Sequence, residues 1–315
     1  MTSLGGGSIP GGFTESVLAA VDRLNGYVYR NRRIVPAVQL LVGLLVLSTF
    51  LVSIAIIVFY SVLQQAPPEE AIRFTVGNYV EFINNDLYTS VFWDSFVISV
   101  KTTLATLALA YPVAYLLAFS DTRWKNVLVL LIVLPFWINL VIRTYAWRLI
   151  FSEQGIINYL FIEVLGVVDQ PMGLLFSQNA IVVGLVHVLL PYMVLPLYVS
   201  MDKIDESHVE AAKNLGANKL QAFYEVTLPQ SIPGAATGVA ISFVLAFGAF
   251  VIPLLLGGDS HIMIANVIGD TYIQYFDWSL GSAMAIAVTA FVLLIVFLFN
   301  RVVGLEGLYG GGEAS

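Results

Sequence analysis

The residues whose types and spacing could do chemistry lie in one polar stretch, which runs from Glu210 to Pro229. It begins Glu210-Ala211-Ala212, continues to Gly216 and ends in Leu228-Pro229. The two alanines favour helix and have minimal bulk, which lets another surface approach closely. Gly216 permits a backbone reversal that a bulky residue would not tolerate. The stretch therefore predicts two short helices around a glycine hinge, a shape suited to insertion into a groove of a partner protein.

The flanking residues give more local detail. Ser207 followed three residues later by Glu210 is the pattern of a capping box, with Ser207 as the N-cap. We expect a second short helix over about 219–226, with Leu220, Phe223 and Tyr224 on one side; Pro229 and Pro233 should end that helix and start the next apolar segment. The alternative is an ordinary connection between two apolar segments, closed by a glycine C-cap.

Composition excludes several classes of protein. The 315 residues are 58% hydrophobic and 11% charged, whereas a soluble domain carries about 25% charged residues. Cysteine is absent, which excludes disulfides, thiolate metal sites and a cysteine nucleophile. The chain has no Gly-x4-Gly-Lys-Ser/Thr loop to hold nucleotide phosphates, and its net charge of −7 does not suit nucleic acid. We expect an all-α integral membrane protein without catalytic residues, metal site or cofactor of its own.

Membrane spans need about 20 mostly apolar residues, and six segments meet this requirement. They are Pro36–Leu63, Ser95–Phe119, Val127–Ile150, Ala180–Met201, Ile232–Gly257 and Leu280–Arg301. The predicted organisation is an N-terminal tail (1–35), a six-helix transmembrane domain (36–301) that contains the polar loop 202–231, and a short C-terminal tail (302–315).

Basic residues set the orientation of these spans. They gather before the first span, between the second and third, between the fourth and fifth, and at the end of the sixth: Arg23, Arg30, Arg32, Arg33, Arg123, Lys125, Lys203, Lys213, Lys219 and Arg301. The alternate loops contain a single basic residue, Arg73. By the positive-inside rule, both termini and the 202–231 loop are predicted to be cytoplasmic.

The tail and the outer loops carry weaker signals. From Thr14 an amphipathic helix could lie on the inner membrane surface, with Val17, Leu18, Val21, Leu24 and Val28 on its apolar side; a partly ordered linker is the alternative. The outer loops are rich in acids: Glu69, Glu70, Glu81, Asp86, Glu153, Glu163, Asp169, Asp259, Asp270 and Asp277. Such a face concentrates cations near the entrance, although acidic loops can also serve solubility alone.

The order and spacing of the polar stretch match the signature EAA-x3-G-x9-I-x-LP of permease subunits of ATP-binding-cassette (ABC) importers, with Val226 in place of the usual Ile. From about Trp93 to Ala290 the chain also resembles the spermidine/putrescine permease family. The matching stretches are Tyr111–Tyr115 (YPVAY), Leu134–Asn139 (LPFWIN), Ile142–Tyr145 (IRTY), Leu189–Tyr198 (LLPYMVLPLY) and Gly216–Gln221 (GANKLQ).

This resemblance implies an inner-membrane subunit with the type I importer permease (MetI-like) fold, forming half of a two-permease pore. The implied partners are two cytoplasmic ATPases that bind ATP and Mg, an external solute-binding protein and a second permease, which we expect to be a sister chain. The ATPase-coupling residues that it implies are Glu210, Ala211, Ala212, Gly216, Leu228 and Pro229.

Candidates for the solute pathway are polar and aromatic residues inside the spans. Trp137, Asn139, Tyr145, Phe247 and Phe250 could offer faces to an ammonium group, although such residues pack more often than they bind. Of the intramembrane cations Lys101, Arg143 and Arg148, the first and last lie near outer ends, where they can snorkel. Arg143 lies deeper. Its expected role is an ion pair or a carbonyl contact; lining the pathway instead, it would repel a polyamine.

Competing functions remain at this point. An importer of another small solute, such as an opine, an amino-acid derivative or ferric iron, would share the same polar stretch. A channel or secondary carrier should show inverted repeats or intramembrane ionisable relays, and neither is evident. A membrane-embedded enzyme would need a nucleophile–base pair or paired carboxylates at membrane depth, and no Asp or Glu lies inside any predicted span.

Overall fold

The computed structural model describes Gly26 and residues 34–64, 73–120 and 123–303. Within these ranges the regular secondary structure is helical, and there is no strand apart from an isolated bridge between Leu63 and Phe74. The predicted amphipathic helix from Thr14 lies outside the described residues except at Gly26, and so does the C-terminal tail from residue 304.

The chain divides into two units, residues 1–59 and 60–315. Helix α2 (Ile34–Ser61) makes up most of the described part of the first unit. Its sequence is apolar on every side, and its apolar side chains from Val38 to Phe59 are largely exposed. A helix that is hydrophobic all round is typical of a membrane span.

The second unit is built around four long helices: α4 (Asp86–Phe119), α8 (Gln178–Met201), α11 (Leu228–Phe247) and α14 (Trp278–Val303). Helices α4, α8 and α11 pack against one another, and α14 packs on α11. Two shorter helices, α3 (Gly77–Asn84) and α13 (Ile264–Ile273), pack on α14 at the end where α4 and α14 begin. Three other short elements are α7 (Ile156–Tyr159), η2 (Leu160–Val164) and η4 (Gly258–Ser260).

Two glycines let α11 approach α8 closely. A Cβ atom at Gly234 would lie 2.5 Å from the Pro196 carbonyl oxygen, and one at Gly238 would lie 2.6 Å from the Met193 Sδ. Small residues four apart are the usual means of close helix packing in membranes. Beside them Met193, Val194 and Leu197 are fully buried, so this seam forms part of the core.

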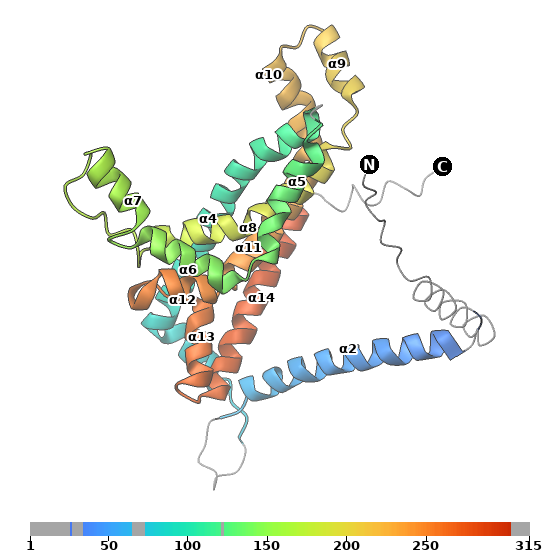
Figure 1. The fold of residues 1–315 in the computed structure, drawn as a ribbon. Coiled ribbons are helices and arrows are strands. Elements are labelled where there is room, and N and C mark those ends of the chain that lie inside the picture. The colour runs from blue at the N-terminus through green and yellow to red at the C-terminus, as the bar shows by residue number, and fades with distance from the viewer. Residues whose placement is uncertain (1–25, 27–33, 65–72, 121–122, 304–315) are drawn as a thin grey trace, which may run out of the picture. The chain divides into compact units, whose positions relative to one another are not determined.

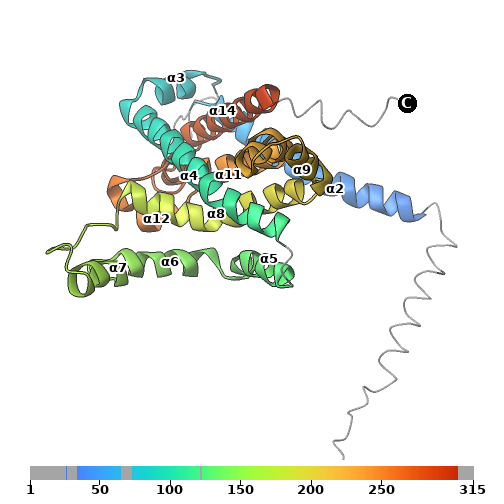
Figure 2. The same cartoon turned by 90° about the horizontal axis from the view of Figure 1, so that it is seen from above.

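The sequence predicted the third span as one continuous helix, and this prediction was wrong. It consists of α5 (Lys125–Val133), a 3-10 turn η1 (Leu134–Trp137) and α6 (Leu140–Phe151), with a bend of 95° between Lys125–Trp137 and Leu140–Val164. Helix α5 ends before Pro135, which has no amide to donate, and Asn139 then starts the next helix, because its side chain accepts from the Val141 amide at 2.8 Å. Figure 2 shows α5, α6 and α7 in a row along one side of α8.

The fifth predicted span is also interrupted. Helix α11 ends at Phe247, with Gly248 as its C-cap, and a separate helix α12 (Val251–Leu256) follows and packs on α6. The other long helices differ from the prediction mainly at their ends, most of all α4, which begins at Asp86 because the Asn85 side chain caps it. Within the described residues five helices are long and apolar enough to cross a membrane, and six if the bent pair counts as one span. The predicted all-α, six-span class is confirmed.

Candidate functional site

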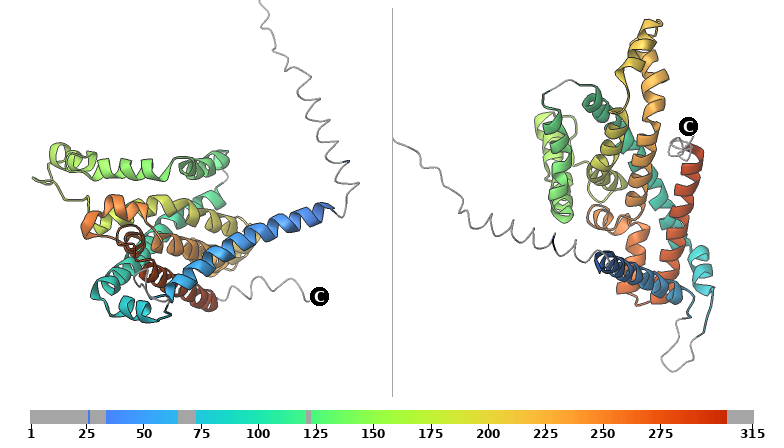
Figure 3. Two further views of the ribbon diagram at one scale, coloured as in Figure 1. Left: turned by 90° about the horizontal axis from the view of Figure 1, so that it is seen from below. Right: turned by 90° about the vertical axis from the view of Figure 1, so that its right-hand side faces the viewer.

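The polar stretch forms a helical hairpin at one end of the second unit. Helix α9 (Glu206–Asn214) and helix α10 (Lys219–Ala222) extend beyond the end of α14, opposite the end that carries α13. Figure 3, right, shows the same pair at the top of the bundle. The hairpin, residues 205–222, is therefore the part of the second unit that is best placed to enter another protein.

The N-cap of α9 is Asp205, and the prediction of Ser207 as the cap was wrong. The Asp205 carboxylate accepts from the Ser207 amide at 2.8 Å, so Ser207 already lies inside the helix. Aspartate caps a helix as well as serine does, and here it comes two residues earlier. The hydrogen bonds from the Ser207 amide and hydroxyl lower the pKa of the exposed Asp205 carboxyl.

Gly216 reverses the chain, as the sequence predicted. Its φ of +98° lies in the region that only glycine enters freely. The Gly216 amide donates to the Lys213 carbonyl at 2.9 Å, and the Ala217 amide donates to the Ala212 carbonyl at 3.0 Å. These two bonds form a Schellman motif, which closes the C-terminus of α9. The second alanine of the signature thus supplies a carbonyl to the turn that Gly216 makes possible.

A capping box that sequence reasoning missed starts the second arm of the hairpin. The Asn218 side chain accepts from the Gln221 amide at 2.9 Å, and the Gln221 side chain accepts from the Asn218 amide at 2.8 Å. The signal was present, since Asn-x-x-Gln directly follows the glycine turn. Glycine turn and capping box together fix the angle between α9 and α10.

The second arm continues without interruption into the membrane domain, which corrects the prediction that Pro229 and Pro233 end it. Helix α10 leads into a π-helical turn, η3 (Phe223–Thr227), and then into α11, so one helical run covers Lys219–Phe247. In the π turn the Leu228 amide donates to the Phe223 carbonyl, five residues back. Pro229 follows in the first turn of α11, where a helix tolerates a residue without a backbone N–H group. The π turn before it shifts the hydrogen bonds by one residue, so no donor is missing at Pro229.

The signature residues occupy different environments. Glu210, Ala211, Gly216 and Pro229 are exposed, whereas Ala212 and Leu228 are half-buried. Glu210 lines a polar pocket of ≈ 230 Å³ together with Tyr115, Phe119, Val209, Lys213 and Thr227. At the tip of the hairpin Leu215 is 91% exposed and Leu220 is 65% exposed. The tip therefore offers two uncovered apolar side chains to whatever approaches the hairpin.

An aromatic contact joins the π turn to α4. The Phe223 ring lies edge-on to Tyr111 and Tyr115, with centroids 5.9 and 5.8 Å apart. The Tyr111 hydroxyl and the Ser231 hydroxyl form a hydrogen bond of 2.8 Å, and Ser231 donates to the Leu228 carbonyl. We call Tyr111, Phe223 and Ser231 the clasp. It links the base of the hairpin to both α4 and α11.

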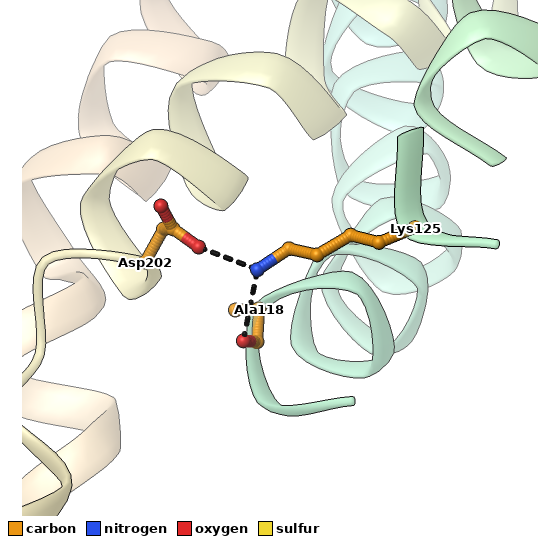
Figure 4. A network of polar contacts seen from close by, with 3 residues as sticks. All are labelled: Ala118, Lys125 and Asp202. Carbon is orange, nitrogen blue, oxygen red and sulfur yellow. Dashed lines mark hydrogen bonds and ion pairs between the residues drawn. The ribbon is translucent and has the colours of Figure 1, made fainter. Parts of the chain in front are cut away.

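A second link lies at the same end of the bundle. Lys125, at the start of α5, donates to the Asp202 carboxylate at 2.7 Å and to the Ala118 carbonyl at 3.5 Å. Figure 4 shows its side chain reaching from α5 to the end of α8. Because both side chains are partly exposed, the pair contributes about 0–1 kcal/mol to stability. Its main effect is to hold the start of α5 against the end of α8.

The predicted pathway residues do not form one cluster. Trp137 is 80% exposed at the end of η1, and Tyr145 on α6 is also exposed. Asn139 caps α6. Phe250 is exposed at the edge of α12, whereas Phe247 is fully buried among other rings and stacks on Phe243 at 5.9 Å. The assignment of a solute-lining role to these residues stays a prediction.

Comparison with known proteins agrees with this geometry. The family model described as "binding-protein-dependent transport system inner membrane component" matches residues 26–305. The spermidine/putrescine transport system permease protein PotB of Escherichia coli strain K12 is 36% identical over 261 residues, covering 83% of this chain and 94% of PotB. PotB of Haemophilus influenzae strain Rd is 36% identical over 231 residues, covering 73% of this chain and 80% of that protein.

A solved structure shares the fold. It is the crystal structure of a bacterial alginate ABC transporter in complex with an alginate pentasaccharide-bound periplasmic protein. It matches with a TM-score of 0.66 at 14% identity and covers 89% of this chain and 96% of that one. Family match, helical architecture and projecting hairpin agree, and this chain belongs to the family of inner-membrane permease components of binding-protein-dependent transport systems.

Proposed function

We propose that this chain is a permease subunit of an ABC importer for polyamines such as spermidine and putrescine. The observation that carries the proposal is the hairpin, in which the signature residues build a glycine-turned projection with an exposed leucine tip. The 36% identity to two permeases named for spermidine/putrescine transport supports the choice of solute.

The hairpin is the cytoplasmic docking site for an ATPase in this proposal. Lys203, Lys213 and Lys219 lie on or beside it, and Lys125 lies at the same end of the bundle. An excess of basic residues is typical of cytoplasmic loops, so both termini are assigned to the cytoplasm. Two ATPase subunits would hold ATP and Mg, one for each permease of the pair, because this chain has no phosphate-binding loop.

Coupling then follows from the continuity of the second arm. A force on α10 reaches α11 directly through the π turn, and it reaches α4 through the clasp. Closure of the ATPases would thereby shift the helices between an outward-open and an inward-open arrangement, since a partner moves an equilibrium only through contacts that differ between its states.

The opposite end of the second unit is the proposed entrance for solute delivered by a binding protein. Glu81, Asp86, Asp270 and Asp277 lie on or beside α3, α4, α13 and α14 at that end. Two of them also have structural roles: Asp277 accepts from the Leu280 amide, and Asp270 accepts from the Gln274 side chain. The negative field of the group favours the arrival of a polycation.

Uptake in membrane vesicles tests the proposal. Vesicles with the complete system should take up labelled spermidine in an ATP-dependent manner, and they should not take up labelled amino acids. Glu210→Lys and Gly216→Pro should leave the chain in the membrane but abolish this uptake. Association with the ATPase should also be measured, and here Gly166→Pro is the matched control: Gly216→Pro should lower the amount of bound ATPase and Gly166→Pro should not. Gly166 also has a positive φ, +60°, but lies in a loop far from the hairpin in the sequence. Stimulation of the ATPase only by a solute other than a polyamine would refute the choice of solute.

A further inference from the structure

Phe276, in the turn between α13 and α14, has a backbone conformation that a bulky residue rarely adopts. Its φ is +52°, and Phe176, at +58°, is the only other non-glycine residue of the described chain with a positive φ. An L-side chain in this left-handed region crowds the backbone, and such strain persists only where the surrounding structure imposes it. Glycine would remove the strain, so the presence of a phenylalanine here needs a reason.

Hydrogen bonds fix the turn on both sides of this residue. The Tyr275 amide donates to the Asp270 carbonyl at 3.1 Å. The Asp277 amide donates to the Thr271 carbonyl at 3.0 Å. The Asp277 carboxylate then accepts from the Leu280 amide at 2.9 Å, in the first turn of α14. The turn is therefore tied to both helices, and its shape sets the direction of the phenylalanine side chain.

The two strained phenylalanines differ in what surrounds their rings. The Phe176 ring packs on Gly258, where an added Cβ atom would lie 2.7 Å from the Phe176 Cδ1 atom. The Arg148 guanidinium lies 5.4 Å from the centre of the same ring. Packing therefore accounts for Phe176. Phe276 is 69% exposed, so burial of its ring within this chain does not offset the strain.

The exposed apolar surface continues on either side of Phe276 and has an acidic rim. Ile273 is 70% exposed and Tyr275 is 71% exposed. We call Ile273, Tyr275 and Phe276 the outer patch. Asp270 and Asp277 flank it in the sequence, and it lies at the end of the second unit that carries α13, opposite the hairpin.

The acidic rim favours a protein over a lipid surface as the cover of the outer patch. Segments that lie on a membrane surface are typically rich in Lys and Arg on their polar side, whereas residues 270–277 contain neither and include two aspartates. A protein surface with an apolar pocket and a basic rim complements both the patch and its charge. In the proposed function, the soluble protein that meets this end of the permease is the solute-binding protein.

We propose that Phe276 anchors the solute-binding protein, with its ring in an apolar pocket whose basic rim faces Asp270 and Asp277. Aromatic side chains are enriched in the cores of protein interfaces. Holding one of them in its bound orientation before association lowers the entropic cost of binding, and this is the reason for the strained turn. The anchor rests on the proposed function in requiring a binding protein, but it does not depend on which solute that protein carries.

Two variants separate the ring from the strain. Phe276→Ala removes the ring and keeps a side chain at positive φ, whereas Phe276→Gly removes the strain as well. Both should weaken binding of the purified solute-binding protein to the permease complex in lipid nanodiscs about tenfold or more. Phe276→Gly should also have a higher thermal midpoint than Phe276→Ala, because alanine is disfavoured at positive φ. Phe276→Tyr keeps an aromatic ring and should retain most of the affinity.

Other phenylalanines supply the controls. Phe297→Ala removes a ring that is 58% exposed within α14, and it should leave the affinity for the binding protein unchanged. Phe176→Gly relieves the same kind of strain but also loses the contacts with Gly258 and Arg148, so its thermal midpoint should not rise above that of the wild type.

Three results would overturn the anchor. The first is wild-type affinity of Phe276→Ala for the binding protein. The second is unchanged affinity together with lower uptake, which would assign the ring to the solute. The third is an equal thermal midpoint for Phe276→Ala and Phe276→Gly, which would show that the position is not strained. Uptake of a solute other than a polyamine would refute the proposed solute instead, and the affinities would then be measured with the binding protein that supports that uptake.

Discussion

Substitution of Gly216 by alanine should weaken docking of the ATPase by an amount that the structure sets. The φ of Gly216 is +98°, and an L-residue in the left-handed region costs roughly 1–2 kcal/mol. A Cβ atom there would meet no atom within 4 Å, so the whole penalty comes from the backbone. Relief of this strain would break the Schellman bonds and change the angle between α9 and α10. At about 1.4 kcal/mol for each factor of ten, affinity should fall about 5- to 30-fold.

The assay is the affinity of the purified ATPase for the permease pair in detergent. Gly216→Asn should have a smaller effect than Gly216→Ala, because asparagine tolerates positive φ better. Gly216→Val should have a larger effect, because a β-branched residue tolerates it least. Gly166→Ala is the control, with φ of +60° and likewise no atom within 4 Å; it should leave affinity unchanged. Wild-type affinity for Gly216→Ala and Gly216→Val would refute the view that this turn shapes the docking surface.

Three further predictions address the clasp, the missed cap and the seam between α8 and α11. Tyr111→Phe removes the 2.8 Å hydrogen bond to Ser231, which is worth about 0.5–1.5 kcal/mol. ATP hydrolysis should continue while the amount of solute taken up per ATP falls; an unchanged ratio of solute to ATP would contradict a coupling role. Asn218→Ala should destabilise the hairpin by about 0.5–2 kcal/mol, seen as faster amide hydrogen exchange in α10, whereas Ser207→Ala should have little effect. Gly234→Ala should lower the thermal midpoint more than Gly238→Ala, because the nearest atom to its new Cβ is a backbone carbonyl oxygen at 2.5 Å, whereas at Gly238 it is a flexible methionine sulfur and the backbone lies 3.2 Å away. The reverse order would contradict the packing.

The sequence predicted the features that rest on composition and on local backbone chemistry. Long apolar runs identified the spans, because a hydrocarbon core requires them whatever the tertiary packing. The hinge at Gly216 was predictable because positive φ is nearly restricted to glycine. The hairpin was predictable as a pair of short helices because the polar stretch separates two apolar segments.

Helix ends and contacts between distant residues were less predictable. Asp205 and Ser207 are both good caps, and the sequence gives no rule for choosing between them. At Asn139 a side-chain cap competes with helix continuation inside an apolar run, and here the cap prevailed. Tyr111 and Ser231 are 120 positions apart, so only the packing of α4 against α11 reveals their bond. That the buried Nε and Nη1 atoms of Arg143 make no hydrogen bond to any described residue likewise needed the structure, since a nearby carbonyl could have satisfied them.

Docking of the hairpin tip on the ATPase is the central claim, and a single cysteine tests it most directly. Leu215 is 91% exposed, and the chain has no other cysteine to interfere. In vesicles that take up solute, Leu215→Cys should cross-link to a lysine of the ATPase through a short reagent that joins a thiol to an amine. Leu149→Cys, at an equally apolar position that is 71% exposed on α6, should not. An unlinked Leu215→Cys chain in vesicles that still import spermidine would contradict the account.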